Sequence, residues 1–183
     1  MQSPAAPASA DFRAQLLAAI PSLRAFGMSL SGRRDLADDL VQETLMKAWD
    51  HHGSFMPGTN LRAWLYTILR NEFYTQIRKR KREVEDADGF HSSQLASLPE
   101  QHGHLDMADF QRALPQLPPD QREAIILVGA SGFSYEEAAE ICKVAVGTIK
   151  SRVNRARNRL TELLHVDIDE GKSAPPARRI ASG

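Results

Sequence analysis

Hydrophobic residues recur every three or four positions through residues 11–82, and no stretch alternates with a period of two for long enough to predict a sheet. The clearest helical stretch is 34–50, "RDLADDLVQETLMKAWD". Its hydrophobic side consists of Ala37, Leu40, Val41, Thr44, Leu45 and Ala48. The stretch 61–82, "LRAWLYTILRNEFYTQIRKRKR", predicts a further helix, whose buried edge consists of Leu65, Leu69, Phe73 and Ile77. We therefore predict an all-α first unit.

A second helical unit is predicted over residues 107–165. The prolines of "LPQLPPDQREAIILVGASG" end one helix and begin the next, because proline fits a first helical turn but not a helix interior. Ser134 and Glu137 have the spacing of a capping box, which marks the next helix start. After the short turn "KVAV", residues 146–160 place one hydrophobic stripe on a helix, made of Ile149, Val153, Ala156 and Leu160. This order predicts a helix-turn-helix.

The two units are separated by residues 83–106, which are rich in acids, Ser, Gly and His and show no periodicity. This segment predicts a flexible acidic linker. Fully extended at ~3.3 Å per residue it reaches roughly 80 Å, about two turns of B-form DNA. Residues 1–10, "MQSPAAPASA", and residues 166–183 are predicted to be disordered tails.

The net charge of zero hides a segregation of charge along the chain. Residues 78–82, "RKRKR", are all basic, and residues 143–159 contain no acid. The single cysteine, Cys142, forms no internal disulfide and closes an amphipathic helix, so we expect it in the core. No apolar run approaches the ~20 residues that span a bilayer, and the start lacks a secretion signal. These features predict a cytoplasmic protein without membrane association.

The polar side of residues 146–160 carries basic and hydrogen-bonding side chains. In a helix-turn-helix, the N-terminal residues of the second helix enter the major groove of DNA. The predicted base-contacting residues are Thr148, Lys150, Ser151, Arg152 and Arg155, and Arg157 and Arg159 lie further along, where they suit phosphates.

The first unit offers two candidate surfaces. The polar side of residues 34–50, here called the acidic face, consists of Asp35, Asp38, Asp39, Gln42 and Glu43. It is either a solvated face whose acids suit a helix N-terminus or a protein-docking surface. In the loop 51–60, "HHGSFMPGTN", Phe55 and Met56 either pack into the core or line a pocket for a flat group.

The helix predicted after this loop interleaves aromatic, amide and basic side chains, which are Trp64, Asn71, Tyr74 and Arg78. Aromatic rings stack on bases while cations follow phosphates, so the pattern suits single-stranded nucleic acid. Core packing is the alternative for Trp64.

Three stretches carry a resemblance to a known family. They are "DLADDLVQETLMKAW", "NLRAWLYTILRN" and "LPPDQREAIILVGASGFSYEEAAEICKVAVGTIKSRVNRARNRL". Residues 11–165 resemble a bacterial RNA polymerase sigma factor of the extracytoplasmic-function group, and the last stretch is most similar to the general-stress-response subgroup of alphaproteobacteria, EcfG. The resemblance implies sigma region 2 at 11–82 and sigma region 4 at 107–165, without the intermediate domain of larger sigma factors.

The resemblance also implies roles for the candidate residues. The acidic face would dock on the β′ clamp helices of the polymerase core, and region 4 would contact the β flap. The loop 53–60 would capture a base flipped out of the −10 promoter element. The implied −10 residues are Gly53, Ser54, Phe55, Met56, Asn60, Arg62, Trp64, Asn71, Tyr74 and Arg78, and those for the −35 element are Thr148, Lys150, Ser151, Arg152, Arg155 and Arg159.

A NepR-type anti-sigma factor is the implied regulator, which holds both units until a phosphorylated PhyR-type protein removes it. The free chain is expected to be a monomer without cofactor or metal. We expect no catalytic residue, since the chain has no phosphate-binding Gly loop, and catalysis would belong to the polymerase. His102 and His104 either bind a metal ion weakly or, more simply, are two solvated side chains.

Two further hypotheses concern regulation. One is that the chain is a sigma-like decoy that binds an anti-sigma factor without initiating transcription, although its intact basic helix favours DNA binding. The other is that the acidic linker lies against the basic surfaces of the free protein and suppresses promoter binding.

Overall fold

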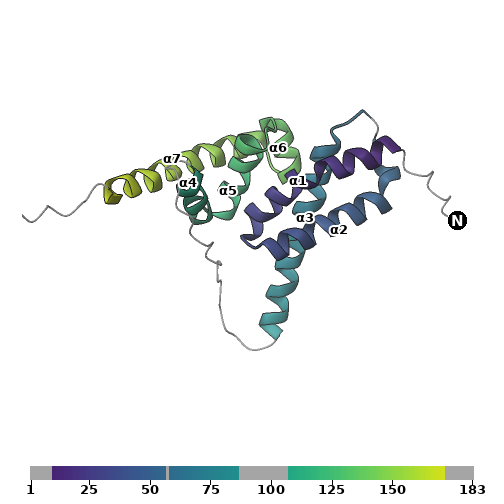
Figure 1. Cartoon of the computed structure of the whole chain (residues 1–183), viewed down its shortest axis with the longest axis horizontal. Coiled ribbons are helices and arrows are strands. Elements are labelled where there is room, and N and C mark those ends of the chain that lie inside the picture. Colours follow the sequence, from purple (N-terminus) through teal and green to yellow (C-terminus); the bar gives the residue numbers. More distant parts are fainter. Residues whose placement is uncertain (1–9, 57, 87–106, 172–183) are drawn as a thin grey trace, which may run out of the picture.

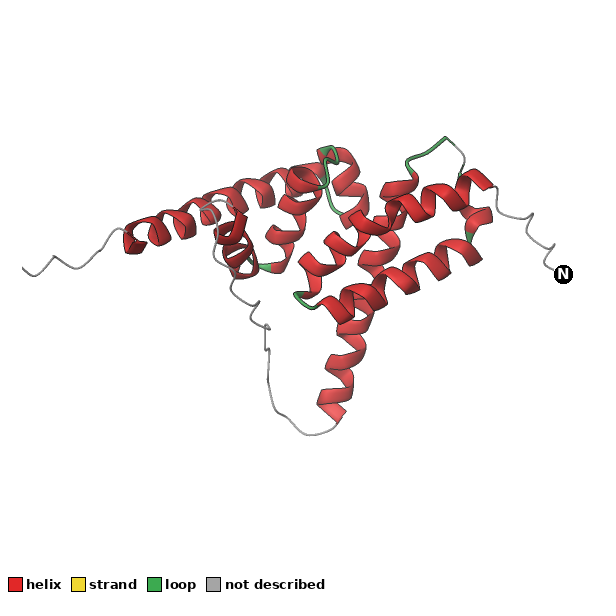
Figure 2. Cartoon of the chain, viewed as in Figure 1, coloured by secondary structure: helices red, strands yellow, loops and turns green. Residues whose placement is uncertain are grey.

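The computed structural model describes residues 10–56, 58–86 and 107–171, and every regular element in these ranges is helical (Figures 1 and 2). The first unit contains α1 (Ala10–Ser31), α2 (Arg34–Asp50), the short 3-10 helix η1 (His52–Ser54) and α3 (Leu61–Asp86). The second contains α4 (Met107–Ala113), the 3-10 helix η2 (Leu114–Gln116), α5 (Pro119–Ile125), the π-helical turn η3 (Ile126–Ala130), α6 (Tyr135–Cys142) and α7 (Val146–Gly171). The predicted all-α fold with two helical units is confirmed.

Helix α2 has the bounds and the buried side that its sequence predicts. Ala37, Leu40, Val41, Thr44 and Ala48 are buried, and Leu45 is half-buried. Helix α1 crosses α2 closely at Gly27, where an added Cβ would lie 3.3 Å from the Cα of Ala37. A glycine there lets the two backbones approach, which sets the separation of the first two helices.

Helix α3 is longer than the bundle it belongs to. Leu65 and Leu69 are fully buried, as predicted, but Phe73 is half-buried and Ile77 is 44% exposed. The C-terminal part of α3 extends away from the other helices in Figure 1. The prediction that Ile77 is buried was therefore wrong, because helical periodicity does not show where the neighbouring helices end.

The second unit contains the predicted helix-turn-helix. The Ser134 hydroxyl accepts a hydrogen bond from the Glu137 backbone N–H (3.0 Å), and the Glu137 carboxylate accepts one from the Ser134 N–H (2.8 Å). This capping box begins α6. Lys143 then turns the chain with a left-handed backbone (φ 56°), and α7 begins at Val146. The stripe Ile149, Val153, Ala156 and Leu160 is buried, as predicted.

The two units pack against each other. Phe133 of the second unit lies edge-on against Tyr66 of α3, with ring centroids 4.9 Å apart, and Tyr66 stacks on Phe26 of α1 at 4.7 Å. One cluster of buried hydrophobic side chains continues from α1–α3 into the second unit. Figure 1 shows α6 beside the first unit. The sequence predicted modules on a tether, and their contact was not foreseen.

Several expectations concern residues outside the described ranges. They include most of the predicted tails, at 1–9 and 172–183, His102 and His104, and most of the linker, so the proposed contact of the linker with the basic surfaces lies there too. The first residues of the predicted linker and of the predicted C-terminal tail are instead helical, as the ends of α3 (83–86) and α7 (166–171). In the part of the chain that the structure describes, no helix has the length and apolarity of a membrane span.

Candidate nucleic-acid interfaces

The outward face of α7 is basic but less open than its sequence predicts. Arg152 forms an ion pair with Asp120 of α5 (3.1 Å), and Arg159 pairs with Glu162 one turn later (2.9 Å). Residues 143–159 contain no acid, but the partners of both arginines, Asp120 and Glu162, lie outside this stretch. Arg155 and Arg157 are exposed and have no acidic partner among the described residues.

The other predicted base-contacting residues lie near the start of α7. Lys150 and Ser151 are exposed, and Thr148 is half-buried. The ammonium of Lys150 lies 5.8 Å from the ring centre of Tyr135, which is a cation–π contact with the first residue of α6. Because the buried stripe fixes the rotation of α7, these side chains and the unpaired arginines lie on the side away from the core.

The acidic face lies on the outer side of α2. Asp38 pairs with Arg24 of α1 (2.5 Å), and a hydrogen bond from Arg33 lowers the pKa of Asp35 below its ordinary value. Asp39, Gln42 and Glu43 are exposed and have no side-chain partner among the described residues.

Two large hydrophobic side chains extend the acidic face. Met46 and Trp49 are 60% and 46% exposed, and they follow Gln42 at helical spacing. Neither residue was among the predicted site residues, because an exposed hydrophobic residue and a core residue look alike in the sequence pattern. This side of α2 therefore presents hydrophobic groups as well as carboxylates.

The two hydrophobic residues of the loop after α2 lie in different environments. Phe55 is half-buried and packs between Phe12 of α1 (ring centroids 6.0 Å apart) and Trp64 of α3 (5.5 Å). Met56 is exposed. Gly53 and Ser54 are exposed as well, and the Ser54 hydroxyl donates to the carbonyl of His51 (2.7 Å).

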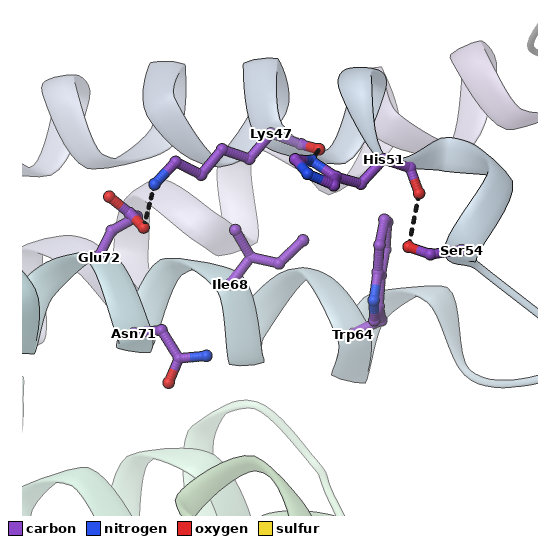
Figure 3. Close-up of a pocket in the computed structure, with 7 residues that line it drawn as sticks. All are labelled: Lys47, His51, Ser54, Trp64, Ile68, Asn71 and Glu72. Carbon is purple, nitrogen blue, oxygen red and sulfur yellow. Dashed lines mark hydrogen bonds and ion pairs between the residues drawn. The ribbon is translucent and has the colours of Figure 1, made fainter. Parts of the chain in front are cut away.

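A pocket of about 280 Å³ lies between α2, this loop and α3. Figure 3 shows Trp64 and Ile68 rising from α3 toward α2, with the Lys47–Glu72 ion pair (2.5 Å) at one end and His51 and Ser54 at the other. Its lining residues are Lys47, His51, Ser54, Trp64, Ile68, Asn71 and Glu72.

The pocket combines an aromatic wall with hydrogen-bonding groups. Ser54, Trp64 and Asn71 are residues that the sequence analysis selected, and the structure brings them together here. Lys47, His51, Ile68 and Glu72 were missed. Lys47 and Glu72 are 25 residues apart and meet only because α2 and α3 pack side by side.

Three predicted −10 residues contact the second unit. The Asn60 amide donates to Glu137 (2.6 Å), and the Tyr74 hydroxyl donates to Glu123 (3.4 Å). The Arg62 guanidinium lies 4.8 Å from the ring centre of Phe133. The remaining residue of this set, Arg78, is exposed beyond the bundle.

A buried ion pair joins the units beside these contacts. Arg70 of α3 donates to both oxygens of Glu123 of α5, at 2.7 and 3.3 Å, and the side chains are 17% and 1% exposed. The Arg70 guanidinium also lies 4.7 Å from the ring centre of Tyr74. We call the Arg70–Glu123 contact the inter-unit ion pair. Neither residue was selected from the sequence, since their 53-residue separation gives no local signal.

Burial changes the ionisation of the groups around this pair. It raises the pKa of the Tyr74 hydroxyl to about 12, with a further contribution from Glu123. It also raises the pKa of the Cys142 thiol to about 12, and Cys142 lies in the core as predicted. Burial lowers the pKa of Arg122, whose Nε has no hydrogen-bond partner in the described structure. No described group of three or more His, Cys, Asp or Glu side chains could hold a metal ion.

Both units match known family models. Residues 17–83 match the model described as Sigma-70 region 2, and residues 107–160 match Sigma-70, region 4. The chain is 63% identical over 161 residues to the ECF RNA polymerase sigma factor EcfG of Rhodopseudomonas palustris (strain TIE-1), which covers 88% of this chain and 89% of that relative.

Solved structures give the same likeness. The sigma factor RpoE, in complex with the anti-sigma factor NepR from Bartonella quintana, is 63% identical with a TM-score of 0.77 over 87% of this chain and 99% of that chain. CnrH, in complex with the cytosolic domain of CnrY, is 27% identical with a TM-score of 0.63 over 87% of this chain and 91% of that chain.

Proposed function

Because the chain belongs to the extracytoplasmic-function RNA polymerase sigma factors, with the resemblance to EcfG confirmed, we propose that it directs the polymerase core to general-stress-response promoters. A NepR-type anti-sigma factor holds it until it is needed. It acts in the cytoplasm as a binding subunit, and the bond-forming chemistry belongs to the polymerase. The observation that carries the proposal is the basic face of α7 on a buried helix-turn-helix scaffold, in the same chain as an aromatic pocket on region 2.

Helix α7 would read the −35 element as duplex DNA. Its first turns present Lys150, Ser151 and Arg155, which suit base edges in the major groove. The unpaired Arg157 suits a phosphate further along. Arg152 and Arg159 would have to exchange their carboxylate partners for DNA, so we assign them a smaller share of the binding energy.

The pocket of region 2 would hold a base of the opened −10 element. Its volume, about 280 Å³, is just below the ~300–1,000 Å³ range of small-molecule pockets, and a single base is a flat ligand of modest size. Trp64 offers a ring for stacking, while Ser54 and Asn71 offer hydrogen bonds to the base edge. Holding one extruded base couples sequence recognition to strand opening.

The outer side of α2 would dock on the β′ clamp helices. The unpaired carboxylates of Asp39 and Glu43 supply charge, and Met46 and Trp49 supply hydrophobic contact area. Aromatic residues and methionine are enriched in the cores of protein interfaces, and charged residues are typical of the rim. Both kinds of side chain on one helix face favour docking over a solvated face.

The packed arrangement of the units hinders binding of the −10 strand. Asn60, Arg62 and Tyr74 contact region 4, so region 4 must leave before these side chains can meet DNA. A protein that binds both units at once stabilises this arrangement, because it adds contacts that are lost when the units separate. This supports the proposal that an anti-sigma factor acts by holding the chain closed.

The test is transcription in vitro with purified polymerase core and a genomic promoter library. The proposal predicts specific initiation that requires this chain and that stops when a NepR-type protein is added. A chain that binds the NepR-type protein but supports no initiation would be the decoy. Two variants separate core binding from −10 recognition. Trp49→Ala should weaken binding to the polymerase core, whereas Trp64→Ala should weaken −10 discrimination in the assembled holoenzyme.

A further inference from the structure

An aromatic contact connects the start of α1 to the pocket of region 2. Phe12, in the first turn of α1, is 8% exposed and lies before the residues that match the region 2 family model. Its ring centre is 6.2 Å from that of His52 and 6.0 Å from that of Phe55. Phe55 in turn lies 5.5 Å from Trp64, the aromatic wall of the pocket.

We propose that Phe12 is a positioning residue that determines promoter discrimination by fixing the loop 51–60 and, through Phe55, the Trp64 ring. Phe12 does not line the pocket, so it acts only through these neighbours. The proposal rests on the function proposed above for the pocket.

The hydrogen bonds described for residues 51–56 of the loop are local, such as those of Ser54 to the carbonyl of His51 (2.7 Å) and of His52 to the carbonyl of Trp49 (2.7 Å). The distant hydrogen bond, from Asn60 to Glu137, lies at the other end of the loop. Gly53, Ser54 and Met56 are exposed. The rings of His52 and Phe55 therefore attach residues 51–56 of the loop to the helix bundle, and Phe12 contacts both rings.

Fixing the loop matters because a base pocket discriminates only when its walls are already in place. A wall that is free to move adapts to a wrong base and loses ordering entropy when any base binds. Removing the Phe12 ring leaves a space beside His52 and Phe55, so the loop and Trp64 gain freedom. The expected loss is in the preference for the correct base, while core binding through α2 stays unchanged.

The first measurement is independent of function. Trp49→Phe leaves Trp64 as the sole tryptophan and keeps an aromatic ring beside His52. In this background, Phe12→Ala should raise the acrylamide quenching constant of Trp64 about twofold by opening its surroundings. Phe12→Leu should lie near the parent. The matched control is Leu16→Ala, which empties a buried position one turn along α1. Unchanged quenching in Phe12→Ala, or an equal rise in the control, overturns the proposal.

The second measurement uses the assembled holoenzyme with natural Trp49. Initiation is compared on a cognate promoter and on one with a substituted −10 base, at a temperature where each variant is folded. Phe12→Ala should lower the ratio of the two rates about tenfold, a typical effect of small displacements in a site. Leu16→Ala should keep the ratio. A raised quenching constant with an unchanged ratio refutes the role of Phe12 in discrimination, whereas wild-type protein that fails to initiate refutes the proposed function itself.

Discussion

Glu123→Gln removes the negative charge that faces Arg70 across the two units. The Glu123 side chain is 1% exposed and that of Arg70 17%, so the variant leaves a largely buried guanidinium without its counter-ion. Removing one partner of a buried pair costs ~3–5 kcal/mol, and the partial exposure of Arg70 favours the lower end. In the separated state both groups are hydrated, so this cost falls on the closed state alone. A cost of about 3 kcal/mol shifts the closed-to-open ratio roughly a hundredfold.

The assay is fluorescence anisotropy with forked DNA that carries a single-stranded −10 element and no −35 element. If closure limits binding, the apparent affinity of the free protein rises with the open fraction, by up to about a hundredfold. The control Glu162→Gln breaks an exposed pair, which is worth ~0–1 kcal/mol, and should change little.

A companion variant separates opening from simple charge effects. Arg70→Gln also breaks the inter-unit ion pair, but it makes the protein less positive where Glu123→Gln makes it more positive. Both variants should tighten binding if the pair holds the units closed. Affinity changes of opposite sign, or changes below twofold in both, would refute the reasoning.

Three further outcomes are expected. Cys142 should react with iodoacetamide at pH 8 roughly a thousandfold more slowly than an unfolded control, because a pKa of about 12 leaves little thiolate; comparable rates would contradict its burial. Ile149→Ala should lower the free energy of unfolding in denaturant by ~2–5 kcal/mol and should weaken −35 DNA binding as a consequence. Arg155→Ala should weaken −35 DNA binding without changing the midpoint of unfolding. The Ser134 N–H and Asn60 lower the pKa of Glu137, so its contribution to stability is present above pH 4.5 and declines as the pH falls through the lowered value; Glu137→Gln should reduce this acid dependence in thermal melts.

Local patterns predicted the elements well because each depends on residues close in sequence. The bounds of α2 follow from one hydrophobic side, and α6 begins at a capping box whose two members are three residues apart. The stripe on α7 was predicted from spacing alone. In each case the physical cause, periodic burial or backbone hydrogen bonding, lies within one helix.

The contact between the units could not be predicted in this way. In the sequence, nothing distinguishes Tyr66 from the other aromatic residues of α3, and an acid such as Glu123 in a short helix has no local pattern that marks it. Their roles depend on Phe133 and Arg70, which meet them only in the tertiary structure. Ile77 shows the same limit, because its exposure depends on where the other helices end.

The candidate site was foreseen in part. Trp64 and Asn71 were selected for their chemistry and do line the pocket, but Lys47 and Glu72 were not, because they come together only through the packing of α2 on α3. Phe12 was not selected either, since a single aromatic residue in a first turn is ordinary core material in a sequence.

The separation of the two units on promoter DNA tests the central claim most directly. Dyes on cysteines introduced at Ala18 of α1 and Asn158 of α7, both exposed and outside the proposed docking and DNA-binding residues, would report it by energy transfer while the buried Cys142 stays unlabelled. We predict high transfer in the free protein, and low transfer in the holoenzyme on a promoter, where the contacted elements lie about two DNA turns, or roughly 70 Å, apart. Transfer that stays high in a transcribing complex would contradict the account.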